Sequence, residues 1–263
     1  MTDRLAAPDR FERPGLIAFG LYLLAITFVV LSIQGAEMSI VTLIEGVPDM
    51  GRMLGEMMPP SLTRIESVGW SLLETFQMAV AGTVFGVLIS LPLAVLAARN
   101  LSPHPLVYHA ARGLISFFRT VPDLIWALFF VVTVGLGPFA GALALVVDTI
   151  GFCGRFFAEA MEEVDPAPSE ALDAIGVGPA GVFAGAVLPA AAPSFINTGL
   201  FSLEKATRSS VVLGLVGAGG IGIELKVAMD MFQYAEAATI ILAIFGLVLV
   251  VEQASAAFRR KLI

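Results

Sequence analysis

The chain has 263 residues, of which 57% are hydrophobic and only 14% are charged, whereas a soluble domain carries about 25% charged residues. Most of the chain is therefore expected to lie in lipid. The formal net charge of -7 argues against a nucleic-acid partner, because such proteins need a basic face that neutralises phosphates. Cys153 is the single cysteine, and no group of His and Cys residues has metal-ligand spacing, so neither a disulfide within the chain nor a metal site is expected.

The N-terminal quarter predicts one membrane span and one surface segment. Residues 1–14 are polar, and the apolar run over 15–33 is long enough to cross a hydrocarbon core about 30 Å thick. A cleaved signal peptide has a shorter apolar region and a small-residue cleavage site, so this run is interpreted as a retained transmembrane helix. Residues 34–69 mix apolar and charged side chains, which predicts an amphipathic segment on the external membrane face.

The remainder, residues 70–263, predicts a core of five more membrane spans. Glycines inside these apolar segments are tolerated, as is usual in packed membrane helices. The predicted spans cover residues 70–98, 114–134, 139–157, 194–215 and 235–251. Together with the first apolar run they predict an all-α integral membrane protein of six transmembrane helices.

The distribution of Lys and Arg predicts the orientation, because cytoplasmic loops collect these residues. If the N-terminus is inside, eight basic residues fall on the cytoplasmic side: Arg4, Arg10, Arg13, Arg99, Arg112, Arg259, Arg260 and Lys261. Only Arg52, Arg64 and Lys226 fall outside. Arg119 and Arg155 are placed towards the cytoplasmic ends of their spans, where long side chains reach the interface. Both termini and the loop over 158–193 are therefore predicted to be cytoplasmic.

The loop over 158–193 is long, and long loops tend to be functional. Its run of Asp165 to Ser169 ends one helix and offers Ser169 as the cap of a short helix over 170–175. Glu170 and Asp173 fall in the first turn of that helix, where the macrodipole favours acids, and Gly176 follows as its stop. The loop is expected to present a compact projection to a partner's groove.

The sequence EALDAIGVGPAGVFAGAVLP resembles the EAA signature of ABC importer permeases, which reads E-A-A, three residues, G, nine residues, I-x-L-P. The residues that match by spacing are Glu170, Ala171, Gly176, Leu188 and Pro189. Two positions depart from the signature, with Leu172 for the second alanine and Ala186 for the isoleucine. In that family the loop forms a coupling helix that docks in a cleft of a separate ATPase subunit. A chance match on an amphipathic hairpin is the alternative.

Five further segments are similar to the permease subunit of phosphonate-type ABC importers, and the likeness extends over about residues 46–225. They are GVPDMGRMLGEMMPP, SLLETFQMAVAGT, FFRTVPDLIWAL, MEEVDPAPSEAL and SVVLGLVGAGGIGIEL. The resemblance implies the type I ABC importer permease fold in a bacterial inner membrane, with a second copy of the chain, two ATP-binding cassette subunits and a periplasmic phosphonate-binding protein as partners. Relatives also serve phosphite and hypophosphite, so the resemblance leaves the phosphorus oxyanion open.

The chain has no Walker A sequence, so it is expected to be a transport subunit without an ATPase site, with ATP and Mg bound by the partner. A permease for methionine or another small solute is the nearest alternative. A secondary transporter would show two related halves and no coupling loop, and a membrane hydrolase would need a convergent nucleophile and base within the spans.

The stretch VGAGGIG fits the dinucleotide pattern G-x-G-x-x-G, but no clean strand precedes it and no acid lies about 20 residues further on. It is expected near the external end of the fifth span. Two interpretations are open for Gly217, Gly219, Gly220 and Gly222. Their backbone amides could face an anion in the translocation pathway, or the glycines could simply allow close packing.

The fifth span also contains charged residues, Glu204, Lys205 and Arg208, and a charge at the membrane centre costs about 2.5 to 3.5 kcal/mol. Glu204 and Arg208 stand at i and i+4, which predicts an ion pair on one face. One interpretation is a structural pair between helices. The other places Arg208 or Lys205 in the translocation pathway, where it attracts the oxyanion and Glu204 holds it in place. Asp148 of the fourth span either pairs with Arg208 or faces the cavity.

Overall fold

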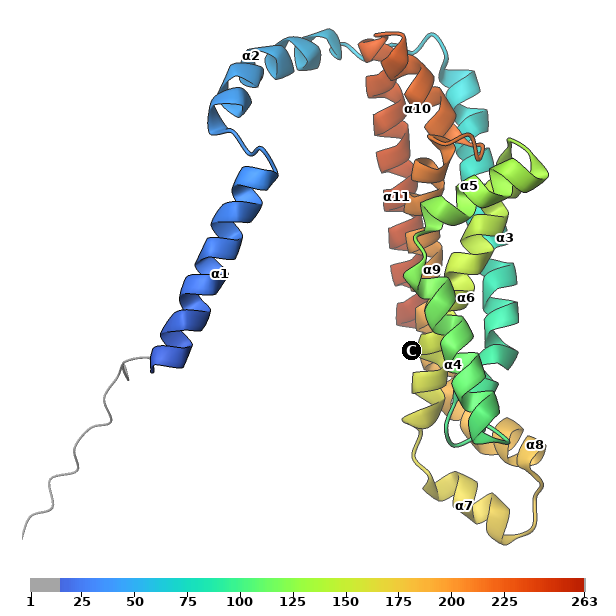
Figure 1. Cartoon of the computed structure of the whole chain (residues 1–263). Helices are drawn as coiled ribbons and strands as arrows, with labels where there is room; N and C mark the ends of the chain where they lie inside the picture. The colour runs from blue at the N-terminus through green and yellow to red at the C-terminus, as the bar shows by residue number, and fades with distance from the viewer. Residues whose placement is uncertain (1–14, 263) are drawn as a thin grey trace, which may run out of the picture. The chain divides into compact units, whose positions relative to one another are not determined.

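The computed structural model describes residues 15–262, and every regular element in that part of the chain is helical (Figure 1). The chain divides into two compact units, residues 1–55 and residues 56–263. The polar segment over 1–14 and its three arginines lie outside the described residues.

The first unit contains one helix of membrane-spanning length and one amphipathic helix. α1 (Leu16–Gly35) is apolar on all sides and has no buried residue, as suits a helix surrounded by lipid. It matches the apolar run predicted over 15–33. α2 (Ile40–Glu56) is amphipathic and pairs Arg52 with Asp49 on its exposed surface. Its position on the external membrane face stays a prediction.

The second unit is a bundle of long helices joined by short ones (Figure 1). A π-helical turn over Phe183–Val187 makes α8 and α9 one continuous helical segment. The helices are α3 (Ile65–Ala97), α4 (Pro105–Thr120), α5 (Asp123–Val134), α6 (Pro138–Glu162), α7 (Ala167–Ala174), α8 (Pro179–Val182), α9 (Leu188–Gly214), α10 (Ile221–Asp230) and α11 (Tyr234–Leu262).

Among the described residues, five helices are long and apolar enough to cross a membrane, or six if the bent pair of α4 and α5 forms one span. The span predicted over 114–134 is not one continuous helix, because its residues are divided between α4 and α5, which meet at an angle of 88°. Val121 is extended, with φ -79° and ψ 121°, because the ring of Pro122 disfavours helical backbone at the preceding residue. Pro122 therefore breaks the apolar run into two helices.

Several helices extend beyond the predicted spans. α6 continues to Glu162 rather than 157, and the helical segment that contains α9 begins at Pro179 rather than 194. α11 continues to Leu262 rather than 251. The hydrophobic pattern marks the apolar part of a helix, whereas the backbone hydrogen bonds continue into polar turns beyond it. The non-helical part of the predicted loop over 158–193 is correspondingly short.

Small residues bring α3 and α6 together. A Cβ at Gly82 would collide with Leu145, and a Cβ at Gly86 would collide with Thr149. The contacts advance by four residues along both helices, so α3 and α6 run in the same direction with their backbones close. This is the small-xxx-small packing of membrane helices, in which dispersion contacts replace a hydrophobic driving force.

The glycine-rich stretch separates α9 from α10 without reversing the chain. Gly199 of α9 lies beside Val87 of α3, whereas Ile221 donates its backbone N–H to Thr75 and Ala228 packs with Val68. These contacts move steadily towards the start of α3, so α9 and α10 run in one direction, antiparallel to α3. The stretch directly follows Gly214, the last residue of α9, and its residues 218–222 are buried in the bundle. Its position near the external end of the span stays a prediction.

Candidate functional site

The short helix of the loop that is predicted to be cytoplasmic is α7 (Ala167–Ala174), and it begins earlier than predicted. The carboxylate of Asp165 accepts the backbone N–H of Ala167 at 3.0 Å. Pro166 and Pro168 have no N–H and need no acceptor in the first turn, which suits them to a helix start. Ser169 consequently lies within the helix and does not cap its N-terminus. Asp165, which accepts the first backbone N–H of the helix, provides the cap.

α7 presents an acidic surface while one apolar side chain holds it to the rest of the loop. Glu170, Ala171 and Asp173 are exposed. Leu172 is half-buried and points at Gly185 of the π-helical turn, where a Cβ would lie 3.2 Å from the leucine. Gly176 ends the helix with φ +83°, a conformation that glycine adopts without strain.

The remaining residues of the signature lie where the loop enters α9. Leu188 and Pro189 directly follow the π-helical turn, inside the continuous helical segment Pro179–Gly214. Ala186 and Val187 are buried, and Val187 packs with Phe157, Ala158 and Met161 of the core. The loop is thus an exposed helix attached to a firmly packed helix start.

The charged residues of α9 form two ion pairs with other helices. Lys205 Nζ lies 2.7 and 2.8 Å from the two carboxylate oxygens of Asp148 on α6. Glu204 Oε1 lies 2.9 Å from Arg259 of α11. Each pair crosses a helix interface, which agrees with the structural interpretation of these charges.

The predicted pair between Glu204 and Arg208 is wrong. The Glu204 side chain is only 9% exposed and takes its cation from α11. A carboxylate at a helix interface needs a cation on the facing helix, whereas an exposed i and i+4 pair gains only a few tenths of a kcal/mol. Arg208 is exposed and has no ion pair among the described residues, and Asp148 pairs with Lys205 rather than with Arg208.

The glycine-rich stretch uses its amides within the chain. The backbone N–H of Gly220 donates to Glu74 Oε1 at 2.8 Å, and that of Ile221 donates to Thr75 Oγ1 at 2.7 Å. Gly217, Gly219 and Gly220 have φ values of +89°, +87° and +74°, which glycine alone adopts freely. Gly222 lies against the backbone of α9, where a Cβ would be 2.8 Å from Gly214 Cα.

These contacts favour the packing interpretation of the glycines, because the amides at 220 and 221 already have acceptors. The residues that accept these two amide N–H groups were not predicted from the sequence. Glu74 and Thr75 stand side by side within an otherwise apolar span, and a carboxylate at that depth signals a specific partner. The pattern alone does not show that the partner lies about 146 positions further along the chain.

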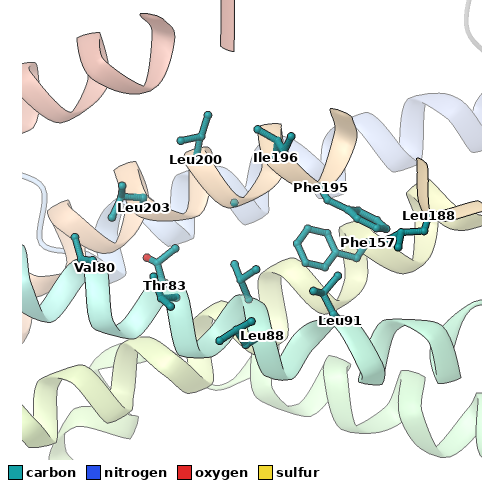
Figure 2. Close-up of a pocket in the computed structure, with 13 residues that line it drawn as sticks. Val80, Thr83, Leu88, Leu91, Phe157, Leu188, Phe195, Ile196, Leu200 and Leu203 are labelled. Atoms are coloured by element: carbon teal, nitrogen blue, oxygen red, sulfur yellow. The ribbon is translucent and has the colours of Figure 1, made fainter. Parts of the chain in front are cut away.

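An apolar groove of about 470 Å³ lies between α3 and α9 (Figure 2). Its labelled lining side chains are Val80, Thr83, Leu88, Leu91, Phe157, Leu188, Phe195, Ile196, Leu200 and Leu203. The Thr83 hydroxyl is buried there without a hydrogen-bond partner among the described residues. A surface of this kind does not compensate the desolvation of an anion, so this groove is not an oxyanion site.

Comparison with known proteins agrees with this architecture. The family model described as binding-protein-dependent transport system inner membrane component matches residues 90–263. The phosphite transport system permease protein PtxC of Stutzerimonas stutzeri is 42% identical over 244 residues, which cover 93% of this chain and 86% of that protein. The phosphate-import permease protein PhnE of Mycolicibacterium smegmatis is 41% identical over 221 residues, which cover 84% of this chain and 42% of that protein.

A solved structure shows the same fold. The inward-facing MetNI methionine ABC transporter matches with a TM-score of 0.69 over 77% of this chain and 99% of the matched chain. Its sequence identity is 24%, so this likeness concerns the fold alone. The all-α permease fold expected from the sequence is confirmed, and the chain belongs to the family of binding-protein-dependent transport system inner membrane components, the multi-pass permeases of ABC importers.

Proposed function

We propose that this chain is the transmembrane subunit of an ATP-driven importer that carries a phosphorus oxyanion, phosphonate or phosphite, from periplasm to cytoplasm. The observation that carries the proposal is the 42% identity to a phosphite permease over 93% of the chain. The likeness to the methionine transporter supports the fold and not the substrate, because it stands at 24% identity. The inward-facing and outward-facing states would alternate around one pathway.

The exposed acidic surface of α7 supports a coupling role. Glu170 and Asp173 project from a helix whose Leu172 packs on the π-helical turn. A cleft in an ATPase subunit that holds ATP and Mg would receive this surface, and the continuous segment of α8, the π-helical turn and α9 would carry its motion into the membrane. α9 reaches the ion pairs of Glu204 and Lys205, so a displacement of α7 acts on the charged centre of the bundle.

We propose that the transporter contains two copies of this chain, two ATPase subunits and a periplasmic binding protein that delivers the oxyanion. One chain supplies one α7, so two ATPase subunits require two chains. The basic residues at the inner ends of the helices support a cytoplasmic position for both termini and for α7.

Cells that lack their own oxyanion uptake provide the test of the substrate. These cells are made to express this chain with its ATPase and binding protein. Labelled phosphite or methylphosphonate should then accumulate to at least about tenfold the level in cells without the chain, because both compounds present the oxyanion that the proposed permease accepts. Labelled methionine, measured in the same cells, serves as the matched control. Import of methionine without either oxyanion would contradict the proposal and favour a methionine permease.

Replacing Lys205 with alanine should separate a structural role from a pathway role. The side chain of Asp148 is 15% exposed and that of Lys205 is 35% exposed, so removing the cation should cost about 1–3 kcal/mol, less than in a fully buried pair. The melting temperature of the purified transporter is the measurement. The double variant Lys205→Ala with Asp148→Ala should regain much of that stability, whereas Arg208→Ala should leave it unchanged.

Uptake in the same variants decides the pathway role. If the double variant regains stability but not uptake, Lys205 or Asp148 contributes to the pathway itself. Uptake restored together with stability would limit the pair to holding α6 and α9 together.

A further inference from the structure

A cavity of about 380 Å³ between α4 and α6 brings together two arginines of α4 and one of α6. Its lining residues are Arg112, Ile115, Ser116, Arg119, Thr120 and Arg155. The sequence interpretation treats Arg119 and Arg155 as separate side chains that reach the membrane interface. The structure places them in one polar cavity.

The amphipathic pattern of α4 and the glycines of α6 create this cavity. Arg112, Ser116 and Arg119 are spaced by four and three residues, so they share one face of α4. α6 approaches that helix closely, because a Cβ at Gly151 would lie 2.7 Å from the backbone nitrogen of Arg119. Arg155 follows one turn later on α6 and lines the same cavity.

The backbone of Arg119 packs closely against α6, whereas its side chain is exposed. Its backbone nitrogen faces Gly151, near the middle of α6 (Pro138–Glu162), and the residue stands in the last turn of α4, just before the bend at Pro122. A cation at this depth is costly unless an anion or a water-filled cavity stabilises it. The exposed guanidinium of Arg119 lines the cavity and is accessible to an anion there.

The charges around the cavity do not balance. Arg112 pairs with Glu162 at 2.9 Å, and Arg155 pairs with Glu159 at 2.8 Å. Arg119 has no ion pair and no side-chain hydrogen bond within residues 15–262. The cavity thus holds one guanidinium in excess, with two further guanidinium groups beside it.

We propose that this cavity binds a phosphorus oxyanion, with Arg119 as the principal ligand and Arg112 and Arg155 beside it. The planar guanidinium group binds phosphate-like oxygens in bidentate fashion, and the hydroxyl of Ser116 adds a donor. The inference rests on the proposed transport function and identifies the occupant as the transported oxyanion on the inner half of its pathway. Lys205 is less suited to this role because Asp148 already neutralises it.

Equilibrium binding of phosphorus-32-labelled inorganic phosphate to the purified transporter, assembled with its ATPase subunits, tests the site. In nanodiscs of phosphatidylcholine alone, Arg119→Gln should weaken the binding by about tenfold or more, the equivalent of one charge-assisted contact. Arg119→Lys should bind with intermediate affinity, because it keeps the charge and loses the bidentate geometry. Arg52→Gln in α2, a surface arginine in the other compact unit, is the matched control and should bind like the parent.

A phospholipid headgroup has the same chemistry, and nanodiscs of equal parts phosphatidylcholine and phosphatidylglycerol identify that source. In native mass spectrometry, the parent could retain phosphatidylglycerol while Arg119→Gln loses it. If the parent also fails to bind phosphate, this result would assign the oxyanion site to lipid. Unchanged phosphate binding together with unchanged lipid retention in Arg119→Gln overturns the proposal. If Arg119→Gln does not assemble, Arg155→Gln takes its place in both measurements, because this substitution leaves the contact between α4 and Gly151 intact.

Failure of this site and failure of the transport function are distinguishable. Normal phosphite or phosphonate uptake by the parent with unchanged phosphate binding in Arg119→Gln removes the site and leaves the transport function. Arginine-dependent phosphate binding without uptake of either oxyanion retains the site and removes the function.

Discussion

Gly222→Ala is expected to lower the melting temperature of the purified transporter by several degrees and to reduce its abundance in the membrane. The new Cβ would meet the Val211 carbonyl oxygen and lie 2.8 Å from Gly214 Cα. Both are backbone atoms that cannot rotate away, and overpacking of this kind costs about 1–3 kcal/mol or more. Thermal unfolding followed in detergent, with quantitative immunoblotting of membranes, measures the effect.

Gly246→Ala in α11 is the matched control for that substitution. It is also a glycine within a helix, but no atom lies within 4 Å of its added Cβ. Alanine has the higher helix propensity by about 1 kcal/mol, so this variant should be as stable as the parent or slightly more stable. Equal melting temperatures for the parent, Gly222→Ala and Gly246→Ala would show that α9 and α10 are not held by close backbone packing.

Glu170→Lys is expected to reduce oxyanion uptake to the level of cells that lack the chain, at normal membrane abundance. Glu170 is exposed, and its side chain makes no hydrogen bond with the rest of the described chain. The substitution should therefore spare folding and reverse the charge only at the surface proposed to enter the ATPase cleft, where a mismatched charge costs several kcal/mol. Uptake of labelled phosphite, with abundance measured in the same membranes, checks the prediction.

Glu163→Lys provides the matched control, because Glu163 is an exposed acid in the same loop but precedes α7. It should transport like the parent. Uptake that is lost equally in both variants would point to the overall charge of the loop, and full uptake by Glu170→Lys would exclude Glu170 from coupling.

The order and membrane character of the helices follow from local patterns, and these patterns predict most of the fold. An apolar run such as 15–33 needs no long-range partner to become a helix, because its own backbone satisfies its hydrogen bonds in lipid. Asp165, the two prolines after it and Gly176 likewise set the limits of α7 through local chemistry. The prediction of Ser169 as the cap fails because prolines in the first turn let the helix begin earlier.

The partners of the charged residues could not be predicted from the sequence. Glu204 and Arg208 have the spacing of a pair, yet α11 supplies Arg259 to Glu204, and α6 supplies Asp148 to Lys205. Spacing along one helix describes only the neighbours on that helix, whereas a buried charge pairs with whichever helix faces it. The bend at Pro122 was readable in principle from the proline, but its angle of 88° depends on how α5 packs across α6.

Local patterns were enough to predict a helical membrane permease with a short helix in the loop over 158–193, because hydrophobic runs, prolines, glycines and the EAA-like spacing act over a few residues each. Which side chains share a site depends instead on how the helices pack. Gly151 brings the backbone of Arg119 against α6, and Gly222 joins α10 to α9. Close approach between helices depends on the absence of side chains at facing positions, and which positions face one another is a property of the packed bundle.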